Sequence, residues 1–375
     1  MEFQSYPFEK LQDLIKEIPQ KVGRISLTIG EPQFKTPAFI RKAIFEYVEL
    51  LNKYPKSAGE DALKDALLQF IKRRFEVDLE YKNLIPSFGT REVLFNFPQF
   101  FLFDKKNPTL AYPNPFYQIY EGAAIASRAK SIYMNLNVEN GFKPQLSKAQ
   151  MQECDLVILN SPNNPTGATL TLDEMKQWVR DALEYDFVLL SDECYSEIYS
   201  NAKPTSILQA SKEVGNTDFK NILALNSISK RSSGPGLRSG FIAGDSEILK
   251  AYARYRTYVG CASPLPLQYA AVAAWSDDKH VEFTREQYKE NLKLAHEILG
   301  VEVPQDTFYV WLKVKDDLRW TKELLIKENI LVLPGSFLSR TDEKGVNPGE
   351  NYVRLALVYE KEIIKDALLR MKNCL

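Results

Sequence analysis

Residues 227–240 contain the side chains whose types and spacing most clearly allow chemistry. Lys230 lies beside two serines, Ser227 and Ser229, and Arg238 follows it after eight positions in a glycine-rich stretch. A lysine amine forms an imine with an aldehyde, and serine hydroxyls with an arginine can hold a phosphate. The segment therefore predicts a site for a small molecule that carries both groups, as pyridoxal phosphate (PLP) does. An ordinary polar loop is the alternative, because short motifs also occur by chance.

A second candidate is Asp192, which ends an apolar run over residues 187–191 and lies three positions before Tyr195. A carboxylate there can pair with the pyridine nitrogen of PLP and keep it protonated, which makes the ring an electron sink. The Tyr195 hydroxyl can hydrogen-bond the phenolic oxygen of the cofactor. A helix N-cap aspartate followed by an aromatic residue is the simpler alternative.

Two further segments offer sites for anions. Gly89 and Thr90, followed by Arg91, would open a helix whose free N–H groups and dipole favour a phosphate; simple helix capping is the alternative. Arg354 lies amid apolar residues at 352–357, where a charge is costly unless it is paired. Because a guanidinium binds a carboxylate through two parallel hydrogen bonds, Arg354 is either a site for a substrate carboxylate or part of an internal salt bridge.

The composition excludes several classes of function. The chain has 375 residues, of which 45% are hydrophobic and 26% charged, and its net charge is −1. These values predict a globular protein of about two domains that binds neither nucleic acid nor a membrane surface, and no apolar run approaches the roughly 18 residues of a membrane span. Four cysteines without a C-x-x-C pair indicate free thiols in the cytoplasm. Two histidines are too few for a multi-histidine metal site, so no metal is expected.

Strand-like runs alternate with helical patterns over most of the chain. Residues 156–160, 187–192 and 222–227 predict buried strands, and residues 60–75 and 171–185 predict helices. This alternation favours an α/β fold with a mostly parallel sheet between helices. Polar residues follow each run, at 161–167, 192–195 and 227–230, and ligands bind beyond the carboxyl ends of such strands. We therefore expect these three groups to meet in one site.

The pattern changes toward the end of the chain. Helices are predicted at 280–299 and 320–328 and at the C-terminus, strands at 308–314, 330–334 and 352–357, and a polar loop at 339–351. This mixture predicts a smaller α+β domain. We expect a large domain over 29–285, a small domain over 286–375, and an N-terminal arm over 1–28 that belongs to the small domain.

Taken in order, these segments resemble the class I aminotransferases, which are PLP-dependent enzymes of fold type I. The strings that carry the resemblance are I-G-E-P at 29–32, N-P-T-G at 164–167, D-E-C-Y at 192–195, S-I-S-K at 227–230 and V-R-L-A-L at 353–357. The resemblance implies the aspartate aminotransferase-like fold and PLP attached to Lys230. It also implies an amino acid and a 2-oxo acid as substrates.

The resemblance assigns further roles. Asn164 would donate to the phenolic oxygen of PLP, Tyr117 would lay its ring on the cofactor, Gly30 would let the N-terminal segment approach the substrate, and Arg354 would hold the α-carboxylate. Tyr54, in Y-P-K-S, resembles a tyrosine that reaches the phosphate in the neighbouring subunit, which implies a homodimer with shared sites. For Tyr117 a core aromatic remains open, and so does a plain turn for N-P-T-G.

Longer strings, at 113–124, 192–199, 227–245 and 255–264, resemble the succinyldiaminopimelate aminotransferases of lysine biosynthesis. They imply amino transfer between N-succinyl-LL-2,6-diaminopimelate and 2-oxoglutarate, with Lys230 as the base. The chain departs from that family at Val259, where a histidine is usual, and at Gly89-Thr90, which often reads G-S. Tyr258 replaces the arginine of aspartate aminotransferases. A PLP-dependent β-lyase with the same residues is a rival, and a PLP-sensing regulator is a weaker one because no basic module precedes I-G-E-P.

Overall fold

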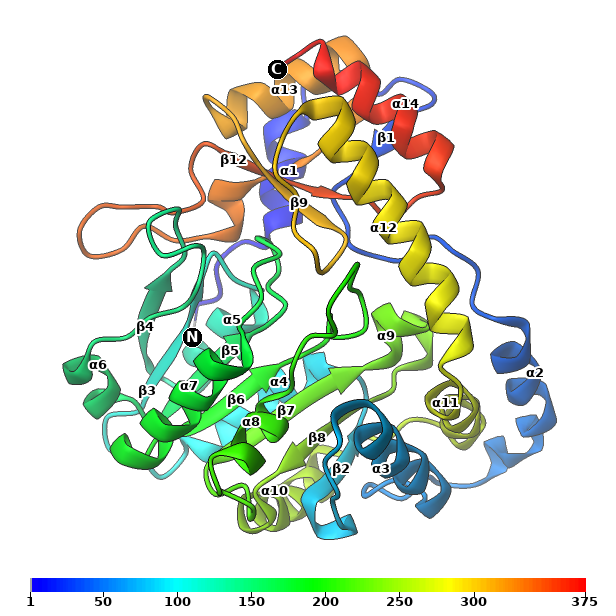
Figure 1. The fold of residues 1–375 in the computed structure, drawn as a ribbon, viewed down its shortest axis with the longest axis vertical. Coiled ribbons are helices and arrows are strands. Elements are labelled where there is room, and N and C mark those ends of the chain that lie inside the picture. Colours follow the sequence, from blue (N-terminus) through cyan, green and yellow to red (C-terminus); the bar gives the residue numbers. More distant parts are fainter. Residues whose placement is uncertain (1) are drawn as a thin grey trace.

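The computed structural model describes residues 2–375, and its largest element is a seven-stranded sheet in the lower part of Figure 1. Its strands are β2 (Leu84–Ser87), β3 (Thr109–Asn114), β4 (Lys130–Asn135), β5 (Leu156–Asn160), β6 (Val188–Asp192), β7 (Ile222–Ser227) and β8 (Gly240–Gly244). The order is β2–β8–β7–β6–β5–β3–β4. Only β8 runs against its neighbours, β2 and β7, so the predicted α/β fold with a mostly parallel sheet is confirmed.

Helices cover both faces of this sheet because alternate side chains of a strand point to opposite sides. Leu156 and Ile158 join one core and Val157 and Leu159 the other. The first face carries α4 (Thr90–Phe101), α5 (Ile119–Ala126) and α10 (Ser246–Val259). The second carries α3 (Asp61–Phe75), α7 (Leu172–Tyr185), α8 (Ile207–Glu213) and α11 (Leu265–Ser276), with α2 (Ala38–Glu46) packed on α11. Short α6 (Lys148–Glu153) precedes β5.

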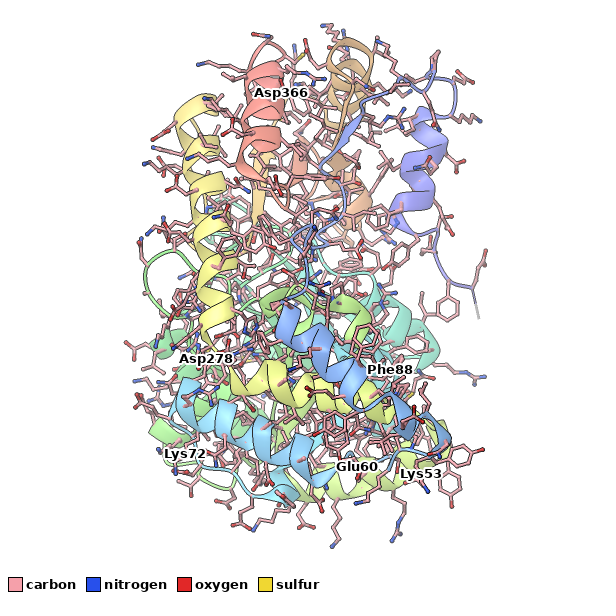
Figure 2. The ribbon with its side chains drawn as sticks, turned by 90° about the vertical axis from the view of Figure 1, so that its right-hand side faces the viewer. Lys53, Glu60, Lys72, Phe88, Asp278 and Asp366 are labelled. Carbon is pink, nitrogen blue, oxygen red and sulfur yellow. The ribbon has the colours of Figure 1, made fainter. Side chains whose placement is uncertain are left out.

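A smaller α+β part lies above the large sheet in Figure 1. It contains β9 (Tyr309–Lys313), β11 (Leu333–Pro334) and β12 (Tyr352–Ala356), paired antiparallel in the order β11–β12–β9. Three helices, α12 (Lys279–Leu299), α13 (Asp317–Glu328) and α14 (Lys361–Lys372), pack on this sheet. The long helix α12 connects the two parts, and Figure 2 shows Asp278 at its lower end. The N-terminal helix α1 (Pro7–Ile15) packs against β11 and α13.

The prediction of one strand over 330–334 is wrong. The segment forms two short strands, β10 (Ile330–Leu331) and β11, which belong to different sheets. β10 pairs in parallel with β1 (Ile25–Ser26), whereas β11 pairs with β12. The buried Val332 separates them, because the residues on its two sides have different partner strands.

The predicted division into an arm, a large domain and a small domain stays a prediction. α12 runs across position 285, where the sequence suggested a boundary. Within residues 2–375, no helix combines the length and the apolar character that crossing a membrane requires.

Candidate active site

One cavity of about 950 Å³ lies beyond the carboxyl ends of three neighbouring strands, where Asn160, Asp192 and Ser227 end β5, β6 and β7. The carboxyl ends of parallel strands meet at one edge of a sheet, so segments far apart in the sequence come together there. The cavity is also lined by these residues that the sequence singled out: Gly30, Thr90, Arg91, Tyr117, Asn164, Tyr195, Ser229, Lys230, Arg238 and Arg354. Gly89 lies beside it, and Tyr54 is elsewhere on the surface.

Lys230 occupies the short helix α9 (Ile228–Arg231) that follows β7. Ser227 caps this helix, since its Oγ accepts a hydrogen bond from the backbone N–H of Ser229 over 3.1 Å. The Nζ of Lys230 donates to the carbonyl oxygen of Gly30. Burial lowers the pKa of Lys230 to about 8, and the nearby charge of Arg354 acts in the same direction. The amine is therefore much closer to its neutral, nucleophilic form at pH 7 than a surface lysine.

Asp192 is buried at the end of β6. Its carboxylate accepts a hydrogen bond from the Tyr120 hydroxyl over 2.7 Å and one from the Cys194 backbone N–H over 3.3 Å. Burial raises the pKa of Asp192, while these hydrogen bonds from Cys194 and Tyr120 oppose the rise. The geometry gives one buried acid on the floor of the cavity that is held in a fixed orientation.

Tyr195 meets Tyr309, which the sequence analysis did not single out. The two hydroxyl oxygens lie 3.0 Å apart. Tyr309 also explains Gly30, because a Cβ at position 30 would overlap the Tyr309 hydroxyl. With any larger residue at position 30, either the N-terminal segment or the Tyr309 side chain would have to move.

Gly89 and Thr90 open α4 as predicted, with Gly89 at the N-cap in a left-handed conformation, φ 74°. A Cβ at Gly89 would collide with the guanidinium of Arg238. Arg238 donates to the backbone oxygens of Pro235 over 2.8 Å and Phe88 over 3.1 Å. Burial and the nearby Arg91 lower the pKa of Arg238. No carboxylate of the part of the chain that the structure describes forms an ion pair with it, so this corner is suited to an anion.

Arg91 and Tyr117 contact each other at the side of the cavity. The Nε of Arg91 donates to the Tyr117 hydroxyl over 2.7 Å. Burial raises the pKa of Tyr117 far above its ordinary value. Arg91, which the sequence grouped with the phosphate residues, lies in the first turn of α4, and its side chain contacts Tyr117.

Arg354 reaches from β12 into the cavity. Its Nη1 donates to Asn164 Oδ1 over 2.8 Å and its Nη2 to the Thr28 carbonyl over 2.5 Å, while its Nε is buried without a hydrogen-bond partner. The guanidinium lies 4.5 Å from the centre of the Tyr309 ring. Among residues 2–375 no carboxylate forms an ion pair with Arg354, so the alternative of an internal salt bridge is not supported.

The sequence analysis assigned no role to Tyr120, Cys194 or Tyr309, which are among the side chains that line this cavity. Tyr120 and Cys194 lie within the strings at 113–124 and 192–199, but only their neighbours were assigned roles. Cys194 Sγ lies 3.1 Å from Thr90 Oγ1 and therefore links the β6 end to the α4 start. Tyr309 carried no signal, because a tyrosine in an apolar strand is common.

The sequence model of the family described as aminotransferase class I and II matches residues 22–363. The chain belongs to this family. It is a PLP-dependent aminotransferase, as the resemblance implied. Solved aminotransferases are similar over the whole chain. AspB from Helicobacter pylori is 51% identical, with 100% of this chain and 99% of that chain covered and a TM-score of 0.97. An aminotransferase from Neisseria meningitidis is 40% identical, with 99% and 98% covered and a TM-score of 0.94.

Relatives of named activity are more distant. An LL-diaminopimelate aminotransferase from Natranaerobius thermophilus is 31% identical over 385 residues, which cover 97% of this chain and 95% of the relative. An aspartate aminotransferase from Pyrococcus horikoshii is 28% identical over 384 residues, with 98% and 94% covered. Aminotransferases that differ in substrate are thus similar to this chain to nearly the same degree.

This aminotransferase has residues that fit PLP, the cofactor of the family. Arg238 faces the cavity without an acidic partner in the described chain, and Gly89 leaves room beside it where a Cβ would collide. The buried carboxylate of Asp192 suits a pyridine nitrogen. The amine of Lys230, with its low pKa, suits an aldehyde. The phosphate, the pyridine ring and the aldehyde of PLP are thus matched in one cavity by Arg238, Asp192 and Lys230, respectively.

Proposed function

We propose that this aminotransferase acts on dicarboxylic substrates and moves the amino group of N-succinyl-LL-2,6-diaminopimelate to 2-oxoglutarate. The observation that carries the proposal is a pair of arginines, Arg354 and Arg91, which both line the cavity. Neither forms an ion pair with a carboxylate of residues 2–375, and the Nη atoms of Arg91 make no hydrogen bond there. A guanidinium binds a carboxylate with two hydrogen bonds, so the two cations suit an α-carboxylate and a distal carboxylate. Arg91 is thereby assigned to the substrate and not to the cofactor.

The succinylated substrate is supported by the long strings that resemble succinyldiaminopimelate aminotransferases. The LL-diaminopimelate aminotransferases among the relatives have names that point to a similar carbon skeleton. Tyr258 replaces the arginine expected for aspartate, and its side chain is largely exposed. In this proposal the protein serves the biosynthesis of diaminopimelate and lysine in the cytoplasm.

A second candidate is unsuccinylated LL-diaminopimelate, which carries a free ammonium group at its distal end. Glu31 lines the same cavity, and a carboxylate there could pair with that ammonium. Succinylation removes this positive charge and adds a carboxylate. The two candidates therefore differ in which rim residue they need: Arg91 for the succinyl group and Glu31 for the ammonium.

In the proposed reaction PLP, when bound, withdraws electrons from the α-carbon of the substrate. Arg354 holds the α-carboxylate and so fixes the orientation of the α-carbon. The Nζ of Lys230 takes the α-proton, which its low pKa allows because the amine must be neutral to accept it. Asp192 keeps its negative charge beside the pyridine nitrogen, and Tyr195 and Asn164 donate hydrogen bonds to the phenolic oxygen.

The proposal includes a homodimer. Tyr54 is fully exposed and lies outside the cavity of its own chain, in a region with exposed Leu51. In the dimer the partner subunit would cover Tyr54, and the Tyr54 hydroxyl would reach the phosphate that is bound near Arg238 of the partner subunit.

A substrate panel with 2-oxoglutarate as acceptor tests the function. N-succinyl-LL-diaminopimelate should exceed aspartate in kcat/KM by on the order of 100-fold or more, because a site with polar groups for one ligand leaves them unpaired with another. Equal turnover of aspartate would overturn the substrate assignment, whereas the assignment as an aminotransferase would remain. Faster turnover of unsuccinylated LL-diaminopimelate would favour Glu31 over Arg91. Pyruvate release from cystathionine would identify a β-lyase.

A further inference from the structure

The helix that carries Lys230 is too short to hold its own shape. α9 spans only the four residues Ile228–Arg231, and one helical turn costs more conformational freedom than its few hydrogen bonds recover. Lys230 itself has a long and flexible side chain. The position of its Nζ therefore depends on what fixes the residues on either side of it.

Arg231, the next residue, is fixed in a way that is unusual for a charged side chain. It is fully buried, and its guanidinium lies against the rings of Phe70 and Trp275, at 5.0 and 5.4 Å from their centres. It donates to the backbone oxygens of Ala274 over 2.7 Å and Asp277 over 3.0 Å. Burial of a guanidinium is costly without such partners, so these contacts stabilise the Arg231 side chain in this position.

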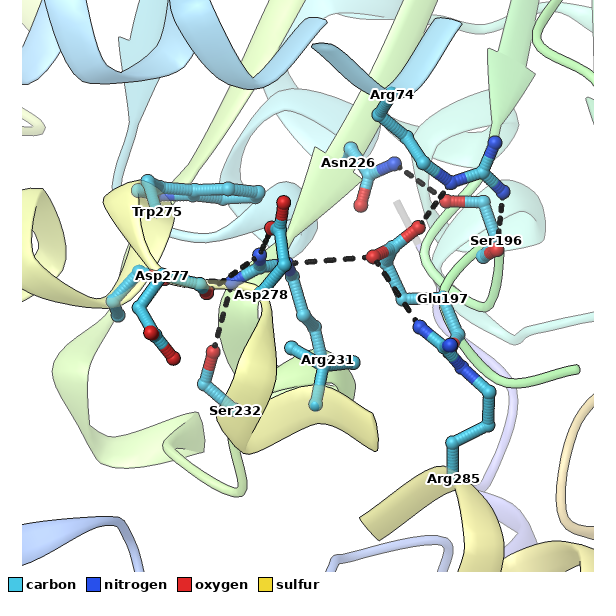
Figure 3. A network of polar contacts seen from close by, with 12 residues as sticks. Arg74, Ser196, Glu197, Asn226, Arg231, Ser232, Trp275, Asp277, Asp278 and Arg285 are labelled. Atoms are coloured by element: carbon cyan, nitrogen blue, oxygen red, sulfur yellow. Dashed lines mark hydrogen bonds and ion pairs between the residues drawn. The ribbon is translucent and has the colours of Figure 1, made fainter. Parts of the chain in front are cut away.

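Two carboxylates complete the surroundings of Arg231 (Figure 3). Its Nη2 contacts Asp278, and its Nε lies 3.6 Å from the carboxylate of Glu197. Glu197 is also buried and accepts a hydrogen bond from Arg74 over 2.5 Å. Arg285 of α12 lies 4.0 Å from the same carboxylate.

The network joins the two segments whose relative position matters for the reaction. Glu197 follows Asp192 and Tyr195 in the segment after β6, and Arg231 follows Lys230 after β7. A second contact supports the first, since Ser232 Oγ lies 2.9 Å from His280 Nε2. The two residues after Lys230 are thus both held by residues 274–280, where α11 ends and α12 begins.

We propose that Arg231 is a positioning residue for Lys230: held between Glu197 and Asp278, it fixes the α9 turn so that the lysine amine faces the cofactor aldehyde. The inference rests on the proposed attachment of PLP to Lys230. The step that it governs is the attack of Nζ on the aldehyde carbon, which forms a C–N bond and releases one water.

The test separates covalent attachment from cofactor binding as such. Cofactor-free protein is mixed with PLP, samples are reduced with borohydride at intervals, and the fraction of Lys230 modified is measured by peptide mass spectrometry. Pyridoxamine phosphate, which has no aldehyde and cannot react with lysine, is titrated separately. Arg231→Met should slow the modification of Lys230 by on the order of 100-fold, as expected for a misplacement of about 1 Å. Its affinity for pyridoxamine phosphate should stay within about twofold of the wild type.

Three variants complete the test. Arg231→Lys keeps a cation and should recover part of the rate. Asp278→Asn removes a partner of Arg231 and should slow attachment in the same way, although less. Arg73→Gln is the matched control, because Arg73 bonds the same Asp278 over 2.6 Å but comes from α3; it should leave the rate unchanged.

The outcomes separate the two hypotheses. If wild-type protein is modified at another lysine, the proposed role of Lys230 fails. If Lys230 is modified in the wild type and equally fast in Arg231→Met, the positioning role fails. The positioning role also fails if Arg231→Met loses both cofactors in parallel, since that indicates general disruption. If Arg231→Met does not fold, the rates of Lys230 modification in Asp278→Asn and Arg73→Gln are compared instead. The positioning role then fails if Asp278→Asn is modified as fast as Arg73→Gln.

Discussion

Arg354 donates a hydrogen bond to the side-chain oxygen of Asn164 over 2.8 Å, although the two residues come from the small sheet and from the turn after β5. An amide whose oxygen accepts from arginine must direct its NH₂ group elsewhere. Asn164 lines the cavity, so this contact orients both the arginine that we propose for the substrate carboxylate and the amide that we propose as a donor to the cofactor. One hydrogen bond thereby sets two parts of the site relative to each other.

Asn164→Asp tests this relationship. The new carboxylate pairs with Arg354 and competes with the α-carboxylate, so KM should rise for every amino acid by on the order of 10–100-fold, the value of a hydrogen bond to a charged group. Initial rates over a range of substrate concentrations measure the change. Asn164→Ala, which adds no competing charge, serves as the control and should raise KM less. An unchanged KM in Asn164→Asp would show that Arg354 does not bind the substrate.

Arg354→Lys should weaken all amino acid substrates together, because a point charge replaces a two-pronged donor at a shared group. The loss in kcat/KM should correspond to about 2–5 kcal/mol. Arg91→Gln is the comparison: it should weaken glutamate much more than alanine, which lacks a distal carboxylate. Kinetics with both amino acids decide the assignment. If the two variants affect alanine equally, the division of labour between the arginines is wrong.

Tyr120→Phe removes the hydroxyl that donates to Asp192. Burial already raises the pKa of Asp192, and the hydrogen bond from Tyr120 opposes this rise, so the variant should raise that pKa further. The acid limb of the pH profile of kcat/KM should then move to higher pH by about 1 unit. Tyr112→Phe is a matched control, because its hydroxyl is bonded to Ser131 over 3.0 Å. Coincident acid limbs in Tyr120→Phe and the wild type would contradict the role of Tyr120.

Lys230→Met should stabilise the cofactor-free protein near neutral pH. The pKa of Lys230 falls from 10.5 to about 8 through burial. Below pH 8 the folded protein therefore contains a buried ammonium group that is less well solvated than in the unfolded chain, and this destabilises the fold. This destabilisation is complete below pH 8 and disappears as the pH rises through 10.5, because between these two pH values the unfolded state binds more protons than the folded state. At pH 7 the gain in unfolding free energy should reach about 3 kcal/mol. Urea unfolding at pH 7 and pH 10.5 measures it, and a gain that does not shrink at the higher pH refutes the cause.

The proposed sharing of each site between two subunits predicts subunit complementation. Tyr54→Phe and Lys230→Ala are each expected to lower activity, and in a mixed dimer one of the two sites holds neither change. Mixing the purified variants under conditions of subunit exchange should therefore restore part of the activity, measured against each variant incubated alone. Sedimentation equilibrium supplies the second measurement. A fully active monomer at assay concentration would exclude the shared site.

Much of the site could be predicted because its residues follow strands that local patterns reveal. Asp192 ends one strand-like run and Lys230 lies three residues after the end of another, and the topology of a parallel sheet brings such ends together. The same patterns gave β5 and β7 with their observed bounds. These predictions needed no information about distant contacts.

The remainder depends on contacts between distant segments. Tyr309 meets Tyr195 across 114 positions, and nothing beside Tyr309 in the sequence indicates a polar partner. The strand over 330–334 was predicted as continuous because its residues are all apolar. Its division at Val332 follows from the pairing of the two halves with different partner strands. Local periodicity contains no information about which strand pairs with which.

The parallel pairing of Ile25 with Ile330 has a consequence for synthesis of the protein on the ribosome. At 5–20 residues per second, the first of these strands waits roughly 15–60 s for its partner. The seven-stranded sheet with Asp192 and Lys230 is translated within that interval, whereas Arg354 emerges after it. The residues of the cavity that follow β6 and β7 are therefore synthesised before Arg354 on β12.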